Sequence, residues 1–320
     1  GDNPAAFTAV APTGDGTFTF QWQNSTDGVT FADIIGETGA TYDAPALTQD
    51  TWYKRLVTSD LGGFLCEKVT NTIKITVNNF DPGSIDADQI ICENSIPVGL
   101  SSVTPTGDGV FTYKWYNSTD GLSFAVIAGA ISETYNPPAL AADMWYRREV
   151  TSTLPGKACT EITNTVNITV NNMVPGSISA DQTICEGDVP AALTSAAATG
   201  DGLITYQWKE SVDGIAFTDI TGADLATFAP PALTVDTWYK RVATSTLGGN
   251  TCTKESNVVK ITVINFLPGS IDADQTICEA TAPAAFTSTA ASGDGIKTYQ
   301  WQNSTDGPSF VIIARATRPT

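Results

Sequence analysis

Residues 206–214 read YQWKESVDG and residues 237–241 read TWYKR, and these two stretches decide the fold. The first stretch alternates in polarity around a central tryptophan and ends in an Asp-Gly pair. This pattern predicts a strand followed by a tight turn, because glycine readily adopts the positive φ that such turns require. The second stretch begins another strand, so the two together predict a pair of antiparallel neighbours in a sheet.

Both stretches recur along the chain at a spacing of 93 residues, which makes internal repetition the dominant signal of the sequence. The aromatic stretch begins at Phe20, Tyr113, Tyr206 and Tyr299. The second stretch recurs as TWYKR from Thr51, MWYRR from Met144 and TWYKR from Thr237. The tetrapeptide PGSI keeps the same spacing and marks the start of each unit at Pro82, Pro175 and Pro268.

The repeat divides the 320 residues into four parts, and a chain of this length exceeds what a single hydrophobic core usually organises. Residues 82–174 and 175–267 are predicted to be complete repeats. Residues 1–81 form a repeat without its first strand, and residues 268–320 form a partial repeat. We expect the chain to continue in a longer array or to be completed by another molecule.

Each unit has the size and pattern of an immunoglobulin-like domain. Its segments are short, rich in Thr, Val and Ile, and separated by turn residues, and about seven strands fit in 93 residues. A tryptophan occupies the position of the core Trp on strand C of such domains at Trp22, Trp115, Trp208 and Trp301. We therefore predict an all-β chain of tandem immunoglobulin/fibronectin-III-like β-sandwich domains.

The strand that begins near Met144 carries a second mark of this fold. Leu140 precedes Tyr146 by six residues, which resembles a tyrosine corner whose hydroxyl bonds back to the preceding backbone. Tyr146 and Arg148 share a face, and Glu149 lies on the opposite one, so the Tyr face is predicted to be buried. The arginine then either stacks on the strand-C tryptophan or extends its tip to the sheet edge, and both alternatives remain open.

The six cysteines form two series with the period of the repeat, 92/185/278 and 66/159/252. Within the complete repeats this predicts the disulfides Cys92–Cys159 and Cys185–Cys252. Partners for Cys66 and Cys278 would lie in another unit or outside the fragment. A metal site would need clustered ligands and a catalytic thiol a neighbouring base, whereas the chain has no Cys-x-x-Cys and no histidine. Disulfides in turn predict an oxidising, extracytoplasmic location.

The net charge and the motifs of the sequence exclude several classes of function. A net charge of -18 repels nucleic acid and anionic membranes, and no apolar run is long enough to span a bilayer. Every polar cluster repeats with the domain, and the commonest general base is missing, so we predict that the chain is not an enzyme.

Three tryptophans are candidates for binding sugar rings, namely Trp52, Trp145 and Trp238. Each precedes the predicted buried tyrosine and should face away from it. The alternative is that these rings cover the sheet or an interdomain contact, which is the more common use of aromatic side chains.

Four acids near the repeat boundaries are weak candidates for a calcium site, namely Asp86, Asp88, Asp272 and Asp274. Calcium needs six to eight oxygen ligands. The third repeat has Ser179 at one of these positions, so the alternative is a solvated acidic surface. We expect no other cofactor.

Residues 205–245, followed by CTKESNVVKITV from Cys252, resemble the immunoglobulin-like (PKD-like) repeats of very large secreted proteins of Bacteroidota-type bacteria. The resemblance covers all four units. It implies a surface-exposed or released polypeptide, often an adhesin, and no catalytic residues. The leading interpretation is therefore the stalk or fibre body of an extracellular adhesin or filament, with self-association or chain continuation and surface glycans as partners. The alternative is an array of carbohydrate-binding modules.

Overall fold

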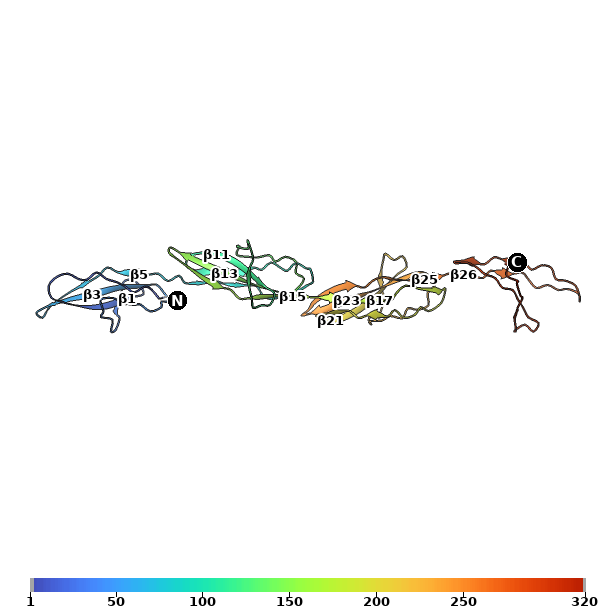
Figure 1. Cartoon of the computed structure of the whole chain (residues 1–320), viewed down its shortest axis with the longest axis horizontal. Helices are drawn as coiled ribbons and strands as arrows, with labels where there is room; N and C mark the ends of the chain where they lie inside the picture. Colours follow the sequence, from blue (N-terminus) through green and yellow to red (C-terminus); the bar gives the residue numbers. More distant parts are fainter. Residues whose placement is uncertain (1–2, 319–320) are drawn as a thin grey trace. The chain divides into compact units, whose positions relative to one another are not determined.

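The computed structural model describes residues 3–318, and their regular secondary structure is entirely β (Figure 1). Contacts divide the chain into two compact units. The first runs through Gln89 and includes Ile96–Ile168. The second consists of Ile90–Ser95 and the chain from Thr169 onward. The end of the opening strand of the second repeat thus belongs to the same compact unit as the third repeat.

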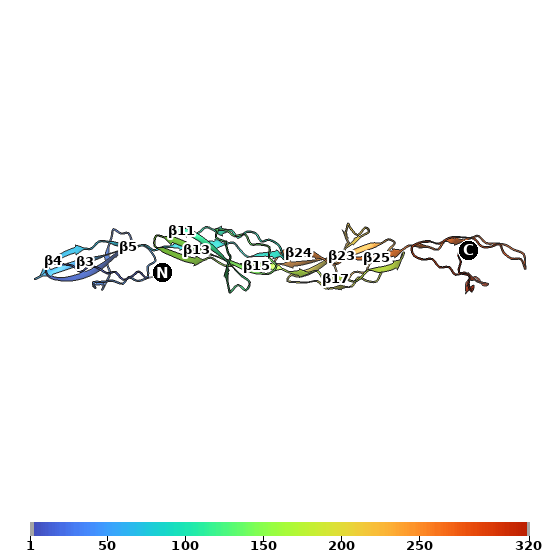
Figure 2. The same cartoon turned by 45° about the horizontal axis from the view of Figure 1, so that its top comes forward.

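The third repeat represents the others. Its strands are β17 (Ser177–Ile178), β18 (Gln182–Cys185), β19 (Ser195–Ala196), β20 (Thr199–Gly200), β21 (Leu203–Ser211), β22 (Thr218–Asp219), β23 (Thr237–Leu247), β24 (Asn250–Glu255) and β25 (Val259–Ile264). The main sheet has the order β18-β25-β23-β21-β22, and β24 pairs with the other half of β23. Figure 2 labels β17, β23, β24 and β25 of this repeat. The pair β17 and β19 and a bridge between Leu193 and Phe228 belong to the opposing layer.

The second repeat reproduces this arrangement. Its strands are β7 (Ser84–Ile85), β8 (Gln89–Cys92), β9 (Ser102–Val103), β10 (Thr106–Gly107), β11 (Val110–Ser118), β12 (Ala125–Val126), β13 (Met144–Leu154), β14 (Lys157–Ile162) and β15 (Val166–Asn171). The first repeat keeps β1 (Thr17–Ser25), β2 (Ala32–Asp33), β3 (Thr51–Leu61), β4 (Phe64–Val69) and β5 (Ile73–Ile75). The predicted all-β fold of tandem immunoglobulin-like sandwiches is confirmed.

Short strands link the repeats, and the strands of the fourth repeat are also short. The linker strands are β6 (Phe80–Asp81), β16 (Met173–Val174) and β26 (Phe266–Leu267), and each pairs with a two-residue strand of the repeat that follows it. The fourth repeat contains β27 (Ser270–Ile271), β28 (Ser288–Thr289), β29 (Ser292–Gly293), β30 (Gln302–Asn303) and β31 (Val311–Ile312).

The core of the third repeat forms around the predicted strand-C tryptophan. Trp208 and Tyr239 are fully buried, and they pack with Leu193, Ile261 and other aliphatic side chains from both layers. Trp208 lies opposite Arg241 in the register of β21 and β23, which directs both side chains to the interior. The counterparts Trp22 and Trp115 are buried in the same way.

The first three repeats each contain a buried arginine, namely Arg55, Arg148 and Arg241. Arg241 is completely buried, and its guanidinium donates to the carbonyl oxygens of Ala226 at 2.6 Å and Pro175 at 3.0 Å. Its Cζ lies 4.4 Å from the Tyr206 ring centroid and 6.0 Å from that of Trp208. Stacking is therefore the correct alternative, with Tyr206 as the nearer ring. The guanidinium ties strands of both layers together.

The tyrosine-corner prediction is only half right. Tyr239 is buried as expected, and burial raises the pKa of its hydroxyl to about 12. However, that hydroxyl has no hydrogen-bond partner among the described residues, so the predicted bond to the backbone is wrong at this position. The ring fills the core next to Phe228, with the ring centroids 5.7 Å apart.

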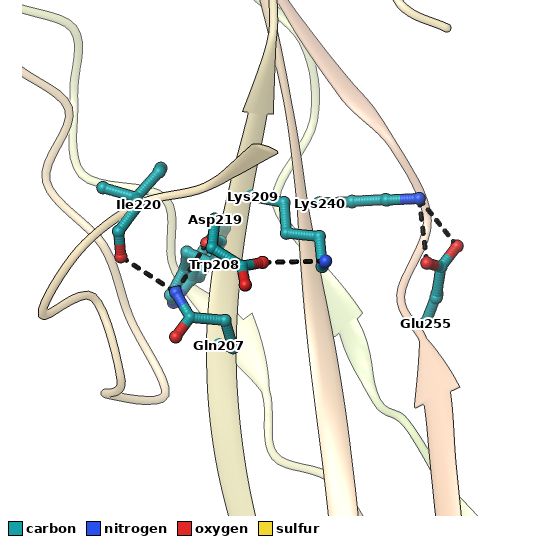
Figure 3. A network of polar contacts seen from close by, with 7 residues as sticks. All are labelled: Gln207, Trp208, Lys209, Asp219, Ile220, Lys240 and Glu255. Carbon is teal, nitrogen blue, oxygen red and sulfur yellow. Dashed lines mark hydrogen bonds and ion pairs between the residues drawn. The ribbon is translucent and has the colours of Figure 1, made fainter. Parts of the chain in front are cut away.

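The solvent face of the same sheet carries ion pairs (Figure 3). Lys209 contacts Asp219 at 2.7 Å, and Lys240 contacts Glu255 at 2.8 Å. Gln207 donates to the carbonyl oxygens of Trp208 and Ile220 at 2.9 and 2.8 Å, which ties strand β21 to the segment after β22. Charged pairs on this face keep the sheet soluble while contributing little net stability each.

Candidate functional site

The two cysteines of the third repeat lie at opposite ends of its main sheet. Strand β18 runs parallel to β25, and this pairing places Cys185 opposite Ile264. Cys252 lies on β24 opposite Ser245, near the other end of β23. About twelve residues of extended strand separate Cys252 from Ile264, which corresponds to roughly 40 Å. Because a disulfide requires Cα atoms about 4.4–6.8 Å apart, the predicted Cys185–Cys252 bond is wrong.

The disulfide that forms joins two successive repeats. Cys92, at the end of the opening strand of the second repeat, bonds to Cys252 of the third, with Cα atoms 5.6 Å apart and a sequence separation of 160 residues. The predicted Cys92–Cys159 pair is wrong for the same geometric reason. Cys66, Cys159, Cys185 and Cys278 are free thiols. The sequence did not reveal that the opening strand pairs parallel to β25. This pairing places the cysteine of the opening strand far from β24.

Side chains on both sides of the disulfide reinforce this joint. Lys254 forms an ion pair with Glu93 at 2.6 Å. Gly248, in the turn between β23 and β24, has a φ of +54°, and a Cβ there would collide with the Ile90 side chain. The opening-strand tip therefore lies directly against this turn, and Cys252 is only 6% exposed.

The last residue of β15 contributes a buried polar contact to the same joint, and the first residue of β16 contributes an apolar side chain. Asn171 Nδ2 donates to the Ser245 carbonyl oxygen at 3.1 Å, and Ser245 Oγ donates to Asn171 Oδ1 at 2.7 Å. Both residues are about 1% exposed or less. Met173 packs against Ala198 and Ala243 and is 3% exposed. Burying a fully paired amide in this way fixes the geometry of the joint.

The first compact unit contains the Asn–Ser contact of this joint one repeat earlier, while Cys159, the counterpart of Cys252, is a free thiol there. Asn78 Nδ2 donates to the Ser152 carbonyl oxygen at 2.9 Å, and Ser152 Oγ donates to Asn78 Oδ1 at 2.8 Å. Phe80 takes the place of Met173, and its ring centroid lies 5.9 Å from that of Phe111. The Asn–Ser contact and the apolar linker residue thus recur with the 93-residue period.

The candidate glycan-stacking tryptophans are partly covered. Trp52, Trp145 and Trp238 are half-buried, and each ring lies under the glycine of an Asp-Gly turn. A Cβ on Gly214 would come within 3.2 Å of the Trp238 ring. Lys260 Nζ lies 4.8 Å from the Trp238 ring centroid, and Lys74 lies at the same distance from Trp52. The rings therefore pack under the glycine of the turn, and sugar binding by them stays a prediction.

The four candidate calcium ligands are not brought together. Asp86 Oδ2 accepts from the Ser101 amide at 3.0 Å, and Asp88 Oδ1 accepts from the Asn167 amide at 2.7 Å. Asp272 and Asp274 are exposed in the fourth repeat. Across residues 3–318 no cluster of three or more acidic or cysteine side chains has a geometry that could hold a metal ion.

A turn acid that sequence reasoning did not single out proves more constrained. Asp120 Oδ1 accepts from the amides of Ser123 at 2.7 Å and Leu122 at 2.8 Å, and from the Ser118 hydroxyl at 2.7 Å. These bonds lower the pKa of the Asp120 carboxyl to about 2, with the Ser123 amide as the largest cause. Asp27, Asp213 and Asp306 occupy the equivalent turns. The signal was present as the repeated S-[TV]-D-G motif.

No helix in the described part of the chain could cross a membrane. The features that recur from repeat to repeat are thus the core arginine and the Asn–Ser contact of the joint.

The family model described as "Domain of unknown function (DUF8696)" matches residues 1–79, 81–172, 174–265 and 267–320. No curated protein sequence matches the chain. The three N-terminal domains of the Highly Immunogenic Outer Capsid protein (Hoc) of bacteriophage RB49 are similar to it at 16% identity and a TM-score of 0.40. That match covers 81% of this chain and 93% of the other.

Two further solved structures have the same general resemblance. An ectodomain fragment of ICAM-5 matches at 16% identity and a TM-score of 0.36, covering 77% of this chain and 67% of the other. The insect immune protein hemolin matches at 12% identity and a TM-score of 0.27, covering 85% and 75%.

Proposed function

Because the chain belongs to a family of domains of unknown function that recurs four times along it, we propose a structural role for these repeats. In this proposal the chain is a segment of the stalk or fibre body of an extracellular bacterial adhesin or surface filament. The observation that carries the proposal is the joint, in which Cys92–Cys252 and the Asn171–Ser245 contact bind one repeat to the next.

The chemistry of the joint supports this role. A covalent bond between repeats resists a pulling force that would separate two domains held by weak contacts alone. Disulfides persist in oxidising compartments, which favours a secreted or surface location. The net charge of -18 keeps a long polypeptide soluble at high local concentration.

The proposal is tested by locating the chain on cells of the source organism. Antibodies raised against the folded chain should label intact, unpermeabilised cells or filaments released from them. Label that appears only after permeabilisation would overturn the extracellular assignment.

A carbohydrate-binding array is the second candidate. The observation in its favour is that the rings of Trp52, Trp145 and Trp238, one in each of three repeats, are half-exposed. A glycan array probed with the oxidised chain separates the two functions. The stalk proposal predicts no binding above background. Binding that is lost in Trp238→Ala and retained in Trp301→Ala would favour the second candidate.

A further inference from the structure

The sequence separation of the Cys92–Cys252 disulfide explains why the other four cysteines are free thiols. Cys92 bonds to Cys252, which lies 160 residues later on β24 of the next repeat. We call Cys252 and its counterparts on β4 and β14 the β24-type cysteines. Applied to Cys185 and Cys278, the same offset gives positions beyond residue 320. Applied backwards to Cys66 and Cys159, it gives positions before residue 1. A single offset therefore accounts for all four free thiols, whereas pairing within a repeat would leave neither Cys159 nor Cys185 free.

The first repeat contains the residues that form the β24 side of this joint, but among residues 3–318 no linker residue or opening strand covers them. Phe18, Val57 and Cys66 occupy the positions of Ile204, Ala243 and Cys252 in the third repeat. There, Met173 covers Ala243 and contacts Ile204, and Cys92 is bonded to Cys252. In the first repeat, the three equivalent side chains line a hollow of about 420 Å³.

The edge next to this hollow is unusually apolar. Strand β4 is 82% exposed at Phe64, 64% at Leu65 and 56% at Val69, and Cys66 is exposed among them. Its counterpart Cys252 is 6% exposed and is bonded to Cys92 in the opening-strand tip of the second repeat. An exposed apolar edge strand invites association. In the third repeat the counterpart of Cys66 is covered, whereas Thr251 and Glu255, the counterparts of Leu65 and Val69, remain exposed.

We propose that every opening-strand cysteine in this family bonds to the β24-type cysteine of the following repeat. Cys159 and Cys66 thus each accept a bond from the repeat that precedes their own, and Cys185 and Cys278 each bond to a repeat that follows. The occupant of the hollow at Phe18 is the end of another repeat of the same family. Its apolar linker residue, the counterpart of Phe80 and Met173, enters the hollow. The proposal deepens the structural role above and depends on it only for an oxidising environment.

The bonding step requires an oxidant of the disulfide class. Two cysteine thiols lose two protons and two electrons as their S–S bond forms. A small-molecule disulfide such as oxidised glutathione accepts them, so that its S–S bond breaks and two thiols leave. Exchange through a mixed disulfide delivers the same products.

A short extension of the full chain tests the proposal. A copy of residues 82–93, PGSIDADQIICE, placed directly before Gly1 restores the opening strand of the first repeat in register. The chain is folded in a glutathione redox buffer, its thiols are blocked, and linked peptides are identified by mass spectrometry. The added cysteine lies in a peptide distinct from that of Cys92, so the two can be separated.

The offset predicts that the added cysteine bonds to Cys159, and that free thiols fall from four to three although one cysteine was added. In the matched variants, Cys159→Ser should abolish the new bond and Cys66→Ser should leave it intact. A bond to Cys66, or an added cysteine that stays free while Cys92–Cys252 forms, would overturn the proposal. The Cys92–Cys252 peptide shows in the same sample that the chain has folded. The experiment is independent of cell-surface labelling, so its failure and that of the proposed function are distinguishable.

Discussion

Reduction of the Cys92–Cys252 disulfide should release a single long segment when the chain is stretched. The bond closes a loop of 160 residues, which a pulling force applied at the chain ends cannot extend. At about 3.4 Å per extended residue, this loop conceals about 550 Å of contour length. In the chain-entropy model a loop of this size also stabilises the fold by about 5 kcal/mol.

Single-molecule force spectroscopy with handles at both ends measures this length directly. Without reductant, the fully unfolded chain should be shorter by about 550 Å than with reductant, and the difference should disappear in one step. Cys252→Ser should give the long contour without reductant, and Cys66→Ser should not. Two separate hidden lengths of about 230 Å each, as bonds within the second and third repeats would give, would refute the reasoning.

Three further predictions concern the sandwich itself. Arg241→Ala should lower the free energy of unfolding, measured by urea denaturation, by about 3 kcal/mol or more, because carbonyl oxygens lose their donors and a cavity opens. The control Lys209→Ala, on the exposed face, should lower it by less than about 1 kcal/mol. Tyr239→Phe should leave the thermal midpoint unchanged or raise it, since the hydroxyl has no partner; a loss of several degrees would instead indicate a tyrosine-corner bond. The Asp120 carboxyl has a folded pKa of about 2, below its ordinary 3.8, so its contribution to stability is complete above about pH 4 and is lost as the pH falls towards 2. Asp120→Asn should therefore flatten the stability profile between pH 4 and 2, and an unchanged acid transition measured by urea midpoints would contradict this.

Much of the sandwich can be predicted from local pattern. Alternation places Trp208 and Arg241 on the buried face, and the Asp-Gly pairs end strands where the structure has turns. These features depend on neighbours in sequence or on one adjacent strand. For the same reason the inward direction of Arg148 was predictable, but its nearest ring, Tyr113 at 5.1 Å, was not. The choice of ring depends on side-chain rotamers that the strand period does not encode.

The joint could not be predicted from the spacing of the cysteines. Two cysteines in each repeat suggest a bond within it, and only the parallel pairing of β18 with β25 shows that Cys185 and Cys252 lie far apart. The pattern of a short strand does not reveal whether it pairs parallel or antiparallel. Likewise, Asn171 and Met173 read as ordinary linker residues until the surface of the following repeat is known. Contacts between repeats depend on how well two surfaces fit, and those surfaces are built from residues far apart in the sequence. The repeat pattern shows which residues recur, but the fold is needed to show which of them meet.

The most direct test of the covalent joint is disulfide mapping of the purified chain of residues 1–320. Free thiols are blocked under denaturing conditions before digestion, so that bonds cannot rearrange, and linked peptides are then sequenced by mass spectrometry. The structure predicts one linked pair, Cys92 with Cys252, and alkylated Cys66, Cys159, Cys185 and Cys278. A linked Cys185–Cys252 or Cys92–Cys159 peptide would contradict a chain whose repeats are bonded one to the next.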